Sequence, residues 1–389
     1  EKYAGAYVKE PVPGKYDWVV SFDLNSLYPH LIMQYNISPE TLWETRHPSA
    51  NVEKLLNQEV DLSGDFAVCA NGAQYRKDKR GFLPEMMQKI YTERVIYKKR
   101  MIQAKKDYEK EPTKQLEKDI SKFNNIQMAR KIQLNSAYGA IGNQYFRYYN
   151  LLNAEAITLS GQVSIRWIEN KMNQKMNKIL KTEDVDYVIA SDTDSIYLNL
   201  GPLVEGVYKG RKETDEVIVG FIDKVCSMEL EPYIESSYEA LAKYVNAYDQ
   251  KMFMKRETIA NKGIWTAKKR YILNAWDIEG VRFAEPKLKV MGIEAVKSST
   301  PGACRDKIRE CLKVIMNKDE DAAQEFIAQF REQFNELPIE DIAFPRGCNG
   351  INKWANQSSI YSKGTPIHVR GALLYNYHNT KQRLTHKYP

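Results

Sequence analysis

The sequence predicts an α+β fold: an antiparallel sheet backed by helices, an inserted helical hairpin and a mostly helical C-terminal part. Two short apolar runs, residues 18–22 and 187–190, have the length and residue types of buried strands, and a tight turn and a third apolar run follow the second. Between them lie two long lysine-rich helical segments, separated at Pro112. A chain of 389 residues is long enough for two or three domains with substantial cores.

Composition and cysteine usage exclude several classes of protein. The chain is 43% hydrophobic with a mean hydropathy of -0.56, and no apolar stretch approaches the length that spans a membrane. Its five cysteines form no CxxC or Cys/His set, which argues against structural zinc and a disulfide framework and favours a reducing, cytoplasmic compartment. The first residues carry neither a start methionine nor a signal-peptide pattern, which predicts a processed product or a piece of a longer protein.

Charge is unevenly distributed along the chain, although the net charge is only +7. Residues 76–110 carry 12 Lys and Arg against 5 Asp and Glu, residues 251–297 carry 11 against 5, and residues 205–239 carry 4 against 9. Two separated basic tracts indicate a polyanion held between subdomains. The alternative is that lysine-rich helices simply present solvated faces.

The first strand should end at Asp23 and lead through a turn into a short helix. Pro29 suits the first turn of that helix, which should run through Tyr35. Residues 41–83 read as an irregular segment with a turn at residues 71–72.

Long helices make up the middle of the chain. Residues 85–110 and 114–138 predict two antiparallel helices, because Glu-Pro-Thr breaks the pattern between them. Amphipathic periodicity predicts further helices over residues 154–180 and 224–245.

The last third should contain strands and then helices. Residues 252–254 and 268–276 read as strands, and Thr300 and Pro301 suit the N-cap and first position of a helix. Helices should continue to about residue 335, after which the chain becomes rich in Gly, Asn and Ser and shows no closing element.

The helical hairpin carries cations at helical spacing. Arg94 and Lys98 are four residues apart on the first helix, and Lys131, Asn135 and Tyr138 share a face of the second. Such charge-assisted donors suit the oxygens of a triphosphate held between the two helices. The alternative is a solvent-facing basic surface.

Three carboxylates occupy the ends of strand-like runs. Asp23 follows the first run, and Asp192 and Asp194 lie in a predicted β-hairpin tip, where their side chains should converge. Carboxylates at buried strand ends need compensation, and few protein oxygens completed by water and phosphate suit Mg²⁺. A solvated or hydrogen-bonded turn is the alternative explanation for the Asp-Thr-Asp sequence.

Three ordered motifs give these residues a family context. DLNSLYPHLI, KIQLNSAYG and SDTDS resemble motifs A, B and C of the family B DNA polymerases, and NISPET, GNQYFRYYN, KKRY and KSSTP resemble the replicative polymerases of tailed phages. The resemblance implies a palm over residues 1–83 and 140–297, fingers over 84–139 and an incomplete thumb over 298–389. It also implies template-directed DNA synthesis from deoxynucleoside triphosphates, in the cytoplasm of the host cell.

The resemblance assigns roles to individual residues. Asp23 and Asp194 would bind two catalytic Mg²⁺ ions, for which Mn²⁺ can substitute, with Asp192 beside them and Glu257 as a secondary carboxylate. Main-chain N–H groups of residues 25–27 would bind phosphates. The incoming nucleotide would contact Ser26, Leu27, Tyr28, Arg94, Lys98, Lys131, Asn135 and Tyr138. Tyr28 would exclude a ribose 2′-hydroxyl, and Tyr138 would lie under the nascent base pair. DNA would contact Gly139, Lys268, Lys269, Arg270, Tyr271, Ser298, Ser299 and Thr300.

Some features depart from the family pattern. His30 stands where serine is usual, Ser191 stands where glycine is common, and the fingers hairpin is shorter than in the phage polymerases. The chain begins just before motif A and ends within the thumb. We therefore expect primer–template DNA and deoxynucleoside triphosphates as partners, with a separate exonuclease-domain chain and a sliding clamp as further ones, and no proofreading by the chain alone.

Two alternatives use some of the same residues. A nucleic-acid-binding remnant would keep the fold without turnover, and a two-metal nuclease would also use clustered carboxylates, although it has no need of Tyr28 and Lys131. A protein-primed polymerase would carry a large insertion between motifs A and B, for which residues 41–83 leave little room.

Overall fold

The computed structural model describes residues 3–343 and 346–382, and its contacts divide into two compact units, Glu1–Ile293 and Glu294–Pro389. The first unit is built on a six-stranded sheet whose strands lie in the order β4-β5-β1-β6-β7-β8. Every neighbouring pair is antiparallel. The strands are β1 (Gly14–Leu24), β4 (Val188–Asp192), β5 (Ser195–Asn199), β6 (Met254–Ala267), β7 (Arg270–Ile278) and β8 (Val281–Met291). The predicted α+β class is confirmed.

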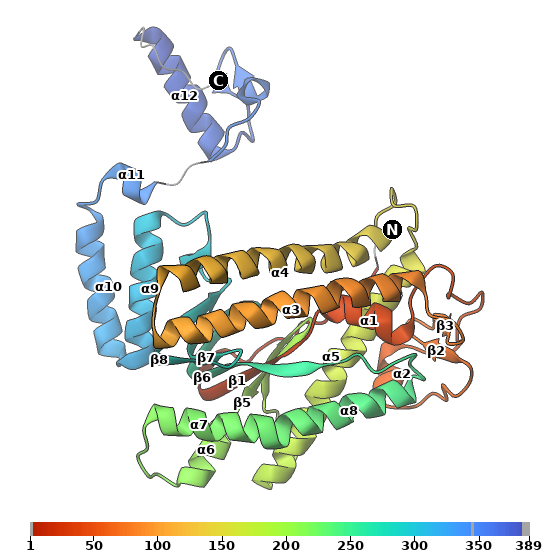
Figure 1. Ribbon diagram of the computed structural model, residues 1–389. Helices are drawn as coiled ribbons and strands as arrows, with labels where there is room; N and C mark the ends of the chain where they lie inside the picture. Colours follow the sequence, from red (N-terminus) through yellow and green to blue (C-terminus); the bar gives the residue numbers. More distant parts are fainter. Residues whose placement is uncertain (1–2, 344–345, 383–389) are drawn as a thin grey trace. The chain divides into compact units, whose positions relative to one another are not determined.

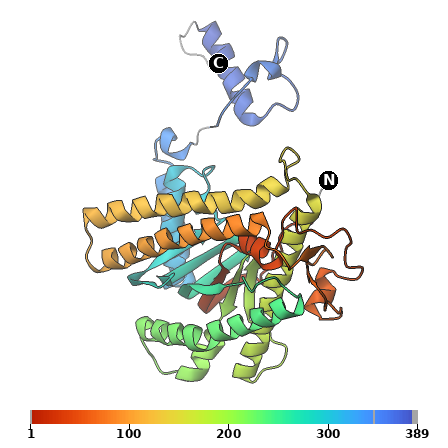
Figure 2. The same cartoon turned by 45° about the vertical axis from the view of Figure 1, so that its right-hand side comes forward.

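Helices cover both faces of this sheet (Figures 1 and 2). On one side lies the hairpin of α3 (Phe82–Lys110) and α4 (Lys114–Ile141). On the other side lie α5 (Leu151–Leu180), α7 (Asp215–Val225) and α8 (Glu231–Tyr244). The core joins alternate residues of β1, such as Val20 and Phe22, to apolar side chains of α5 and α8. Because side chains alternate along a strand, Asp23 points to the opposite face of β1 from Phe22 and Leu24.

The long helices confirm most of the sequence predictions. The break at residues 111–113 is stabilised by Thr113, whose hydroxyl caps α4 by accepting the N–H of Leu116 at 3.2 Å. The helix predicted from residue 224 begins earlier, with α7, and reaches α8 through a π-helical turn at Cys226–Leu230. Pro232, near the start of α8, lacks the N–H that a regular helix would use, which accounts for a local change in hydrogen bonding.

Several shorter elements correct the predictions. The segment read as irregular contains α2 (Val52–Leu56) and a hairpin of β2 (Phe66–Val68) and β3 (Gln74–Arg76), whose turn includes the predicted residues 71–72. The expected strand at residues 252–254 overlaps the much longer β6 only at Met254, and the one expected at residues 268–276 begins at Arg270 as β7. The first unit also contains α1 (Leu27–Tyr35), predicted correctly, and α6 (Gly201–Tyr208).

The second unit is mostly helical, as predicted, but it has a closing element. It contains a 3-10 turn (Glu294–Val296), α9 (Gly302–Asn317), α10 (Glu320–Phe334), α11 (Ile339–Ile342), a 3-10 turn (Ile351–Trp354), β9 (Ala355–Asn356), β10 (Ile360–Tyr361) and α12 (Ile367–Lys381). Pro301, and not Thr300, is the cap of α9, and no side chain caps that end. α12 packs Val369 and Leu373 with Ile351, so the prediction that no closing element follows residue 335 is wrong; residues 383–389 lie outside the described part. No helix in either described stretch of the chain is long and apolar enough to cross a membrane.

Candidate active site

A pocket of about 340 Å³ lies where the end of β1 and the β4–β5 hairpin face α3 and α4. It gathers residues that are more than 100 positions apart in the sequence. Its lining consists of Asp23, Leu24, Asn25, Ser26, Leu27, Tyr28, Arg94, Lys98, Lys131, Asn135, Tyr138, Thr193 and Asp194. One pocket is therefore lined by every residue that the sequence analysis assigned to the incoming nucleotide. It is also lined by two of the three carboxylates assigned to metal, Asp23 and Asp194.

Two carboxylates lie at the floor of this pocket. Asp23 pairs with Ser195 across β1 and β5, and the N–H of Leu24 donates to the carbonyl oxygen of Asp194 at 2.8 Å. Burial raises the pKa of Asp23, and the neighbouring charge of Asp194 raises it further. Burial also raises the pKa of Asp194, whereas the ammonium group of Lys131 lowers it. Two adjacent, partly buried carboxylates ionise together readily only when a cation compensates them.

The donor set fits a hard divalent cation that takes its remaining ligands from water and phosphate. No cluster of three or more His, Cys, Asp or Glu side chains suited to a metal ion occurs among residues 3–343 and 346–382. Asp23 and Asp194 are the pair that could hold such an ion. Asp192 belongs to the same hairpin, but its two oxygens accept bonds from Lys269 at 2.7 and 2.8 Å. Asp192 and Asp194 thus have different partners, although the charge of Asp192 still raises the pKa of Asp194.

Glu257 on β6 lies close enough for its charge to raise the pKa of both Asp23 and Asp194. Its own oxygens are bonded to Lys289 at 2.9 Å and to the hydroxyl of Ser21 at 3.2 Å. Glu257 therefore lies near both carboxylates, but its oxygens are already bonded to two other side chains.

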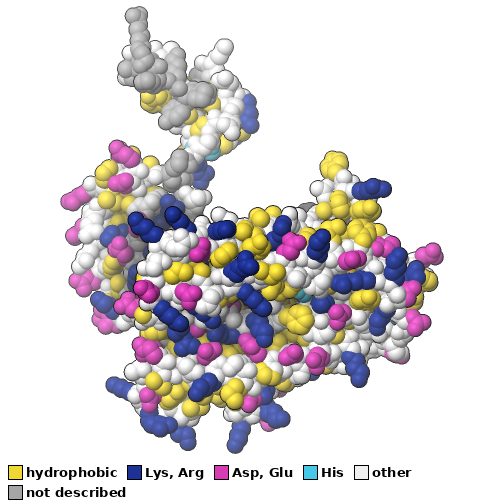
Figure 3. All heavy atoms as spheres, in the orientation of Figure 1, with side chains coloured by type: hydrophobic (Ala, Val, Ile, Leu, Met, Phe, Trp, Pro, Cys, Tyr) yellow, Lys and Arg dark blue, Asp and Glu magenta, His cyan; other side chains and the backbone are white. Residues whose placement is uncertain are grey.

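The hairpin places its polar side chains opposite the carboxylates. Arg94 donates to the hydroxyl of Ser26 at 2.6 Å and to Gln127 at 3.4 Å, and its burial lowers its pKa. Lys98 is paired with Glu279 at 2.5 Å. Lys131 and Asn135 are exposed on the pocket side of α4. Figure 3 shows Lys and Arg side chains distributed over the outer face of the hairpin as well, so charge alone does not single out these positions.

The turn between β1 and α1 is shaped for contact with an anion. Ser26 adopts the left-handed conformation (φ 43°, ψ 62°), which brings the start of α1 directly after the strand. The first N–H groups of a helix have no partner within it, so those of Leu27 and Tyr28 suit a phosphate. The N–H of Asn25, by contrast, donates to the carbonyl oxygen of Phe253 at 2.9 Å and is not available.

Two tyrosines pack against each other at the side of the pocket. The ring centroids of Tyr28 and Tyr138 are 4.6 Å apart, and the hydroxyl of Tyr138 is 2.8 Å from that of Tyr3. Burial raises the pKa of Tyr28 to about 12, so its hydroxyl stays protonated at neutral pH. The two rings together form one wall of the pocket.

The residues assigned to DNA lie outside this pocket. Lys268 and Lys269 form the turn between β6 and β7, where Lys268 pairs with Glu10 at 3.2 Å. Tyr271 is buried, its hydroxyl lies 2.6 Å from that of Tyr197, and its ring stacks on Trp265. Gly139 is exposed near the end of α4, with open space where a side chain would begin. Arg270 lies in β7, and Ser298, Ser299 and Thr300 belong to the second unit.

The two single-residue departures from the family pattern, His30 and Ser191, are accommodated locally. His30 is buried, its Nδ1 is 3.0 Å from the carbonyl oxygen of Ser26, and its ring packs edge-on against Tyr91. The side chain of Ser191 is also buried, and its hydroxyl donates to Glu169 at 3.2 Å. The hairpin forms with serine at this position.

An N-terminal segment at the hairpin was not recognised from the sequence. Val8 pairs with Asp192 as an isolated bridge. The N–H of Lys9 donates to the carbonyl oxygen of Ser191, and the N–H of Thr193 donates to the carbonyl oxygen of Tyr7. The amino group of Lys9 bonds to Glu169 at 2.8 Å, to Asp186 at 2.5 Å and to the carbonyl oxygen of Val188 at 2.7 Å. No local pattern marks these residues, because each partner is more than 150 positions away.

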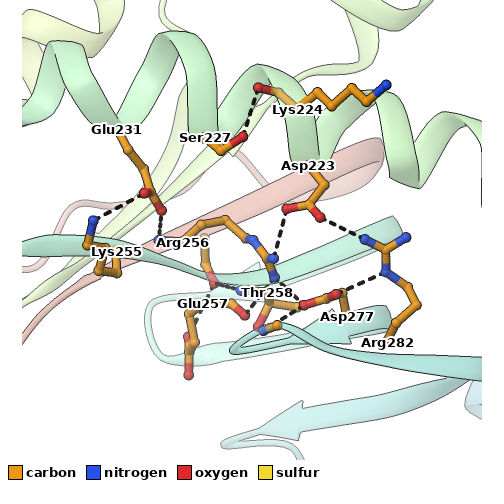
Figure 4. A network of polar contacts seen from close by, with 12 residues as sticks. Asp223, Lys224, Ser227, Glu231, Lys255, Arg256, Glu257, Thr258, Asp277 and Arg282 are labelled. Carbon is orange, nitrogen blue, oxygen red and sulfur yellow. Dashed lines mark hydrogen bonds and ion pairs between the residues drawn. The ribbon is translucent and has the colours of Figure 1, made fainter. Parts of the chain in front are cut away.

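An ion network centred on the buried pair of Arg256 and Asp277 was also missed. Arg256 and Arg282 face Asp223 and Asp277 in a closed set of ion pairs, which Figure 4 shows between β6, β7, β8 and α7. Three of these residues lie in the basic tract at residues 251–297, but nothing in that tract indicates which charges are paired inside the protein.

Comparison with known proteins agrees with this geometry. Residues 1–346 match the family model for DNA polymerase family B. The chain is 36% identical to the DNA-directed DNA polymerase of Escherichia phage RB69 over 97% of its own length, and 34% identical to that of Enterobacteria phage T4 over 96%. It is 27% identical to DNA polymerase 1 of Pyrococcus abyssi over 88%. It spans 47% of the length of each phage relative and 36% of the archaeal one. The chain belongs to DNA polymerase family B, in its phage-type branch.

Proposed function

We propose that this chain carries out template-directed DNA synthesis, transferring a deoxynucleotide from its triphosphate to the 3′-hydroxyl of a primer. The observation that carries the proposal is the single pocket in which Asp23 and Asp194 face Arg94, Lys98 and Lys131. In this proposal the sheet with its backing helices is the palm, the α3–α4 hairpin is the fingers, and the second unit is part of the thumb.

The roles of the side chains follow from their charges. Two Mg²⁺ ions bound at Asp23 and Asp194 would supply the positive charge that activates the primer hydroxyl and stabilises the leaving pyrophosphate. Arg94, Lys98 and Lys131 bind the triphosphate oxygens, and the N–H groups at the start of α1 hold the same phosphates. The chain's own contribution is therefore positioning and charge neutralisation.

Nucleotide selection depends on the tyrosine wall. The ring of Tyr28 lies under the sugar and leaves no room for a 2′-hydroxyl, while Tyr138 supports the nascent base pair. Their mutual packing at 4.6 Å supports this proposal, because a gate must not yield when the larger sugar enters. Lys269 and its neighbours on the β6–β7 turn bind the primer–template. The separate exonuclease chain and the sliding clamp stay predictions.

Primer extension with Mg²⁺ tests the proposal. The purified chain should extend a primer in the presence of a template and deoxynucleoside triphosphates, and Asp194→Asn should abolish extension while leaving binding to primer–template largely intact. Asp184→Asn is the matched control, because Asp184 is an exposed aspartate with positive φ ten residues before Asp194. Binding without any extension by the parent chain would favour a nucleic-acid-binding remnant instead, and normal extension by Asp194→Asn would remove the metal assignment.

A further inference from the structure

Lys98 lies between two pockets. It lines the candidate active site and also a second pocket of about 420 Å³, which shares Asp23 and Asn25 with the first. Its amino group is bonded to Glu279, and the side chains of the pair are 31% and 32% exposed. The pair is partly shielded from water, so a phosphate that binds Lys98 must compete with a carboxylate already in place. Arg94, by contrast, is bonded to the uncharged side chains of Ser26 and Gln127.

Glu279 is presented by a tight and well-anchored turn. Ile278 pairs with Val281, which leaves Glu279 and Gly280 as the two-residue connection between β7 and β8, with φ values of 52° and 81°. Positive φ at both positions is typical of the turns that join antiparallel strands. The N–H of Glu279 donates to the carbonyl oxygen of Glu257 at 2.6 Å, which ties the turn to β6.

The ion network of Arg256, Arg282, Asp223 and Asp277 fixes the base of this turn (Figure 4). One oxygen of Asp277 accepts the N–H of Gly280 at 2.9 Å and a bond from Arg256, and the other accepts Nε of Arg282 at 2.9 Å. Asp223 binds the two guanidinium groups from the opposite side, at 3.0 and 2.9 Å. Because Asp277 is only 2% exposed, the network holds the turn from within the protein.

The same hairpin contacts α3 at further points. Glu109, three helical turns after Lys98 and therefore on the same face, pairs with Lys287 of β8 at 2.6 Å. Between them, the amino group of Lys106 would lie 3.6 Å from a side-chain carbon placed on Gly280. The β7–β8 turn therefore lies along α3, and Glu279, which lines the second pocket, pairs with a lysine that also lines the candidate active site.

We propose that Glu279 is a positioning residue for nucleotide binding, which holds Lys98 in the absence of nucleotide and releases it to an incoming nucleoside triphosphate. The proposal rests on the proposed role of Lys98 in binding the triphosphate. A triphosphate offers several charged oxygens where Glu279 offers one carboxylate, so it displaces Glu279 when it is fully seated. A nucleotide whose phosphates do not reach Lys98 fully forms a weaker bond with it and leaves the Lys98–Glu279 pair intact. The pair therefore weakens the binding of such a nucleotide more than that of a fully bound one.

The dissociation constant of a deoxynucleoside triphosphate tests this proposal. It can be measured without turnover, from the fluorescence of 2-aminopurine in the template of a dideoxy-terminated primer–template bound to the full chain. Removing the competing charge with Glu279→Gln should tighten binding about two- to five-fold, the range typical of partly exposed ion pairs. Glu279→Asn, which suits the positive φ at this position, should give the same result if the charge is what matters.

A double-mutant cycle isolates the contact with Lys98. Lys98→Met alone should weaken binding about ten-fold or more, as expected for loss of a charge-assisted bond. Adding Glu279→Gln to Lys98→Met should then change nothing, because Glu279 acts through Lys98. The control Glu109→Gln removes the outer pair on the same helix and should leave the dissociation constant unchanged.

The outcomes separate the two levels of the proposal. If Lys98→Met does not weaken binding, the nucleotide role of Lys98 fails, and the role of Glu279 fails with it. If Lys98→Met weakens binding but both Glu279 variants bind like the parent, only the role of Glu279 is wrong. Tightening that persists in the Lys98→Met background would show a general effect of charge near the pocket and would also overturn the proposal.

Discussion

The ion network around Asp277 should be worth several kcal/mol to the stability of the first unit, and Asp277→Asn measures it. The substitution keeps the size of the side chain and an oxygen for the N–H of Gly280, but removes the negative charge between Arg256 and Arg282. Asp277 is 2% exposed and Arg256 is 8% exposed, so water cannot replace the lost partner. Arg282 is 40% exposed, and its share is correspondingly small.

We therefore expect Asp277→Asn to lower the free energy of unfolding by about 3 kcal/mol, near the lower end of the range for breaking a buried ion pair. With a urea dependence of about 3 kcal/mol per M, the unfolding midpoint should fall by about 1 M. Urea titration followed by tryptophan fluorescence and circular dichroism measures this shift. Asp78→Asn is the control, because its pair with Arg76 is 2.6 Å long but exposed, and it should leave the urea midpoint almost unchanged. Equal midpoints for the two variants would refute the argument from burial.

Three other substitutions test separate parts of the structure. Tyr28→Ala should raise the efficiency of ribonucleotide incorporation, relative to deoxynucleotide incorporation, at least ten-fold in a competition assay. This factor is equivalent to about 1.4 kcal/mol of lost steric exclusion. An unaltered ratio would show that the ring does not exclude the ribose 2′-hydroxyl. Burial lowers the pKa of His30 from 6.5 to about 4. Below pH 6.5 the unfolded chain therefore takes up a proton that the folded chain does not, and the free energy of unfolding decreases towards pH 4. His30→Gln should remove about 2 kcal/mol of the loss in unfolding free energy between pH 7 and pH 5, and parallel pH profiles would contradict this. Lys9→Met should lower the free energy of unfolding by about 3 kcal/mol, because it leaves the charge of Glu169 without its cation. Adding Glu169→Gln to the same chain should restore at least half of the lost free energy. If nothing is restored, the loss comes from packing and not from charge.

Local sequence predicted those elements whose pattern is complete within a short segment. The strand ending at Asp23, the hairpin around Thr193 and the two long helices all have continuous patterns and clear breaks. β8 was missed because its sequence contains Pro286 among charged residues, which argues against a strand; it forms because it is the edge strand, where a missing N–H can face outward. α12 was missed because it buries only a few apolar residues and contains Gly371.

The site was predictable for a different reason. Most of the residues that line the pocket lie within the three ordered motifs, and Arg94 and Lys98 share helical spacing on α3, so the sequence grouped them, whereas it did not indicate their partners. Glu279 is 181 positions from Lys98, and Lys269 is 77 positions from Asp192. Charged residues in a turn have no periodicity that reveals a partner so far away. Only the folded sheet brings these turns next to the motifs.

The pairing of Val8 with Asp192 has a practical consequence for handling the protein. β4 is the last strand on its side of the sheet, and residues 7–9 bind the main chain of residues 191–193 at the hairpin that joins β4 to β5. Without them, Ser191 and Thr193 would present a free backbone acceptor and donor that a strand of another molecule could engage, the usual route to edge-to-edge aggregation. Shortened versions of the chain should therefore begin before Tyr7, and an affinity tag should be joined upstream of this segment and not in place of it.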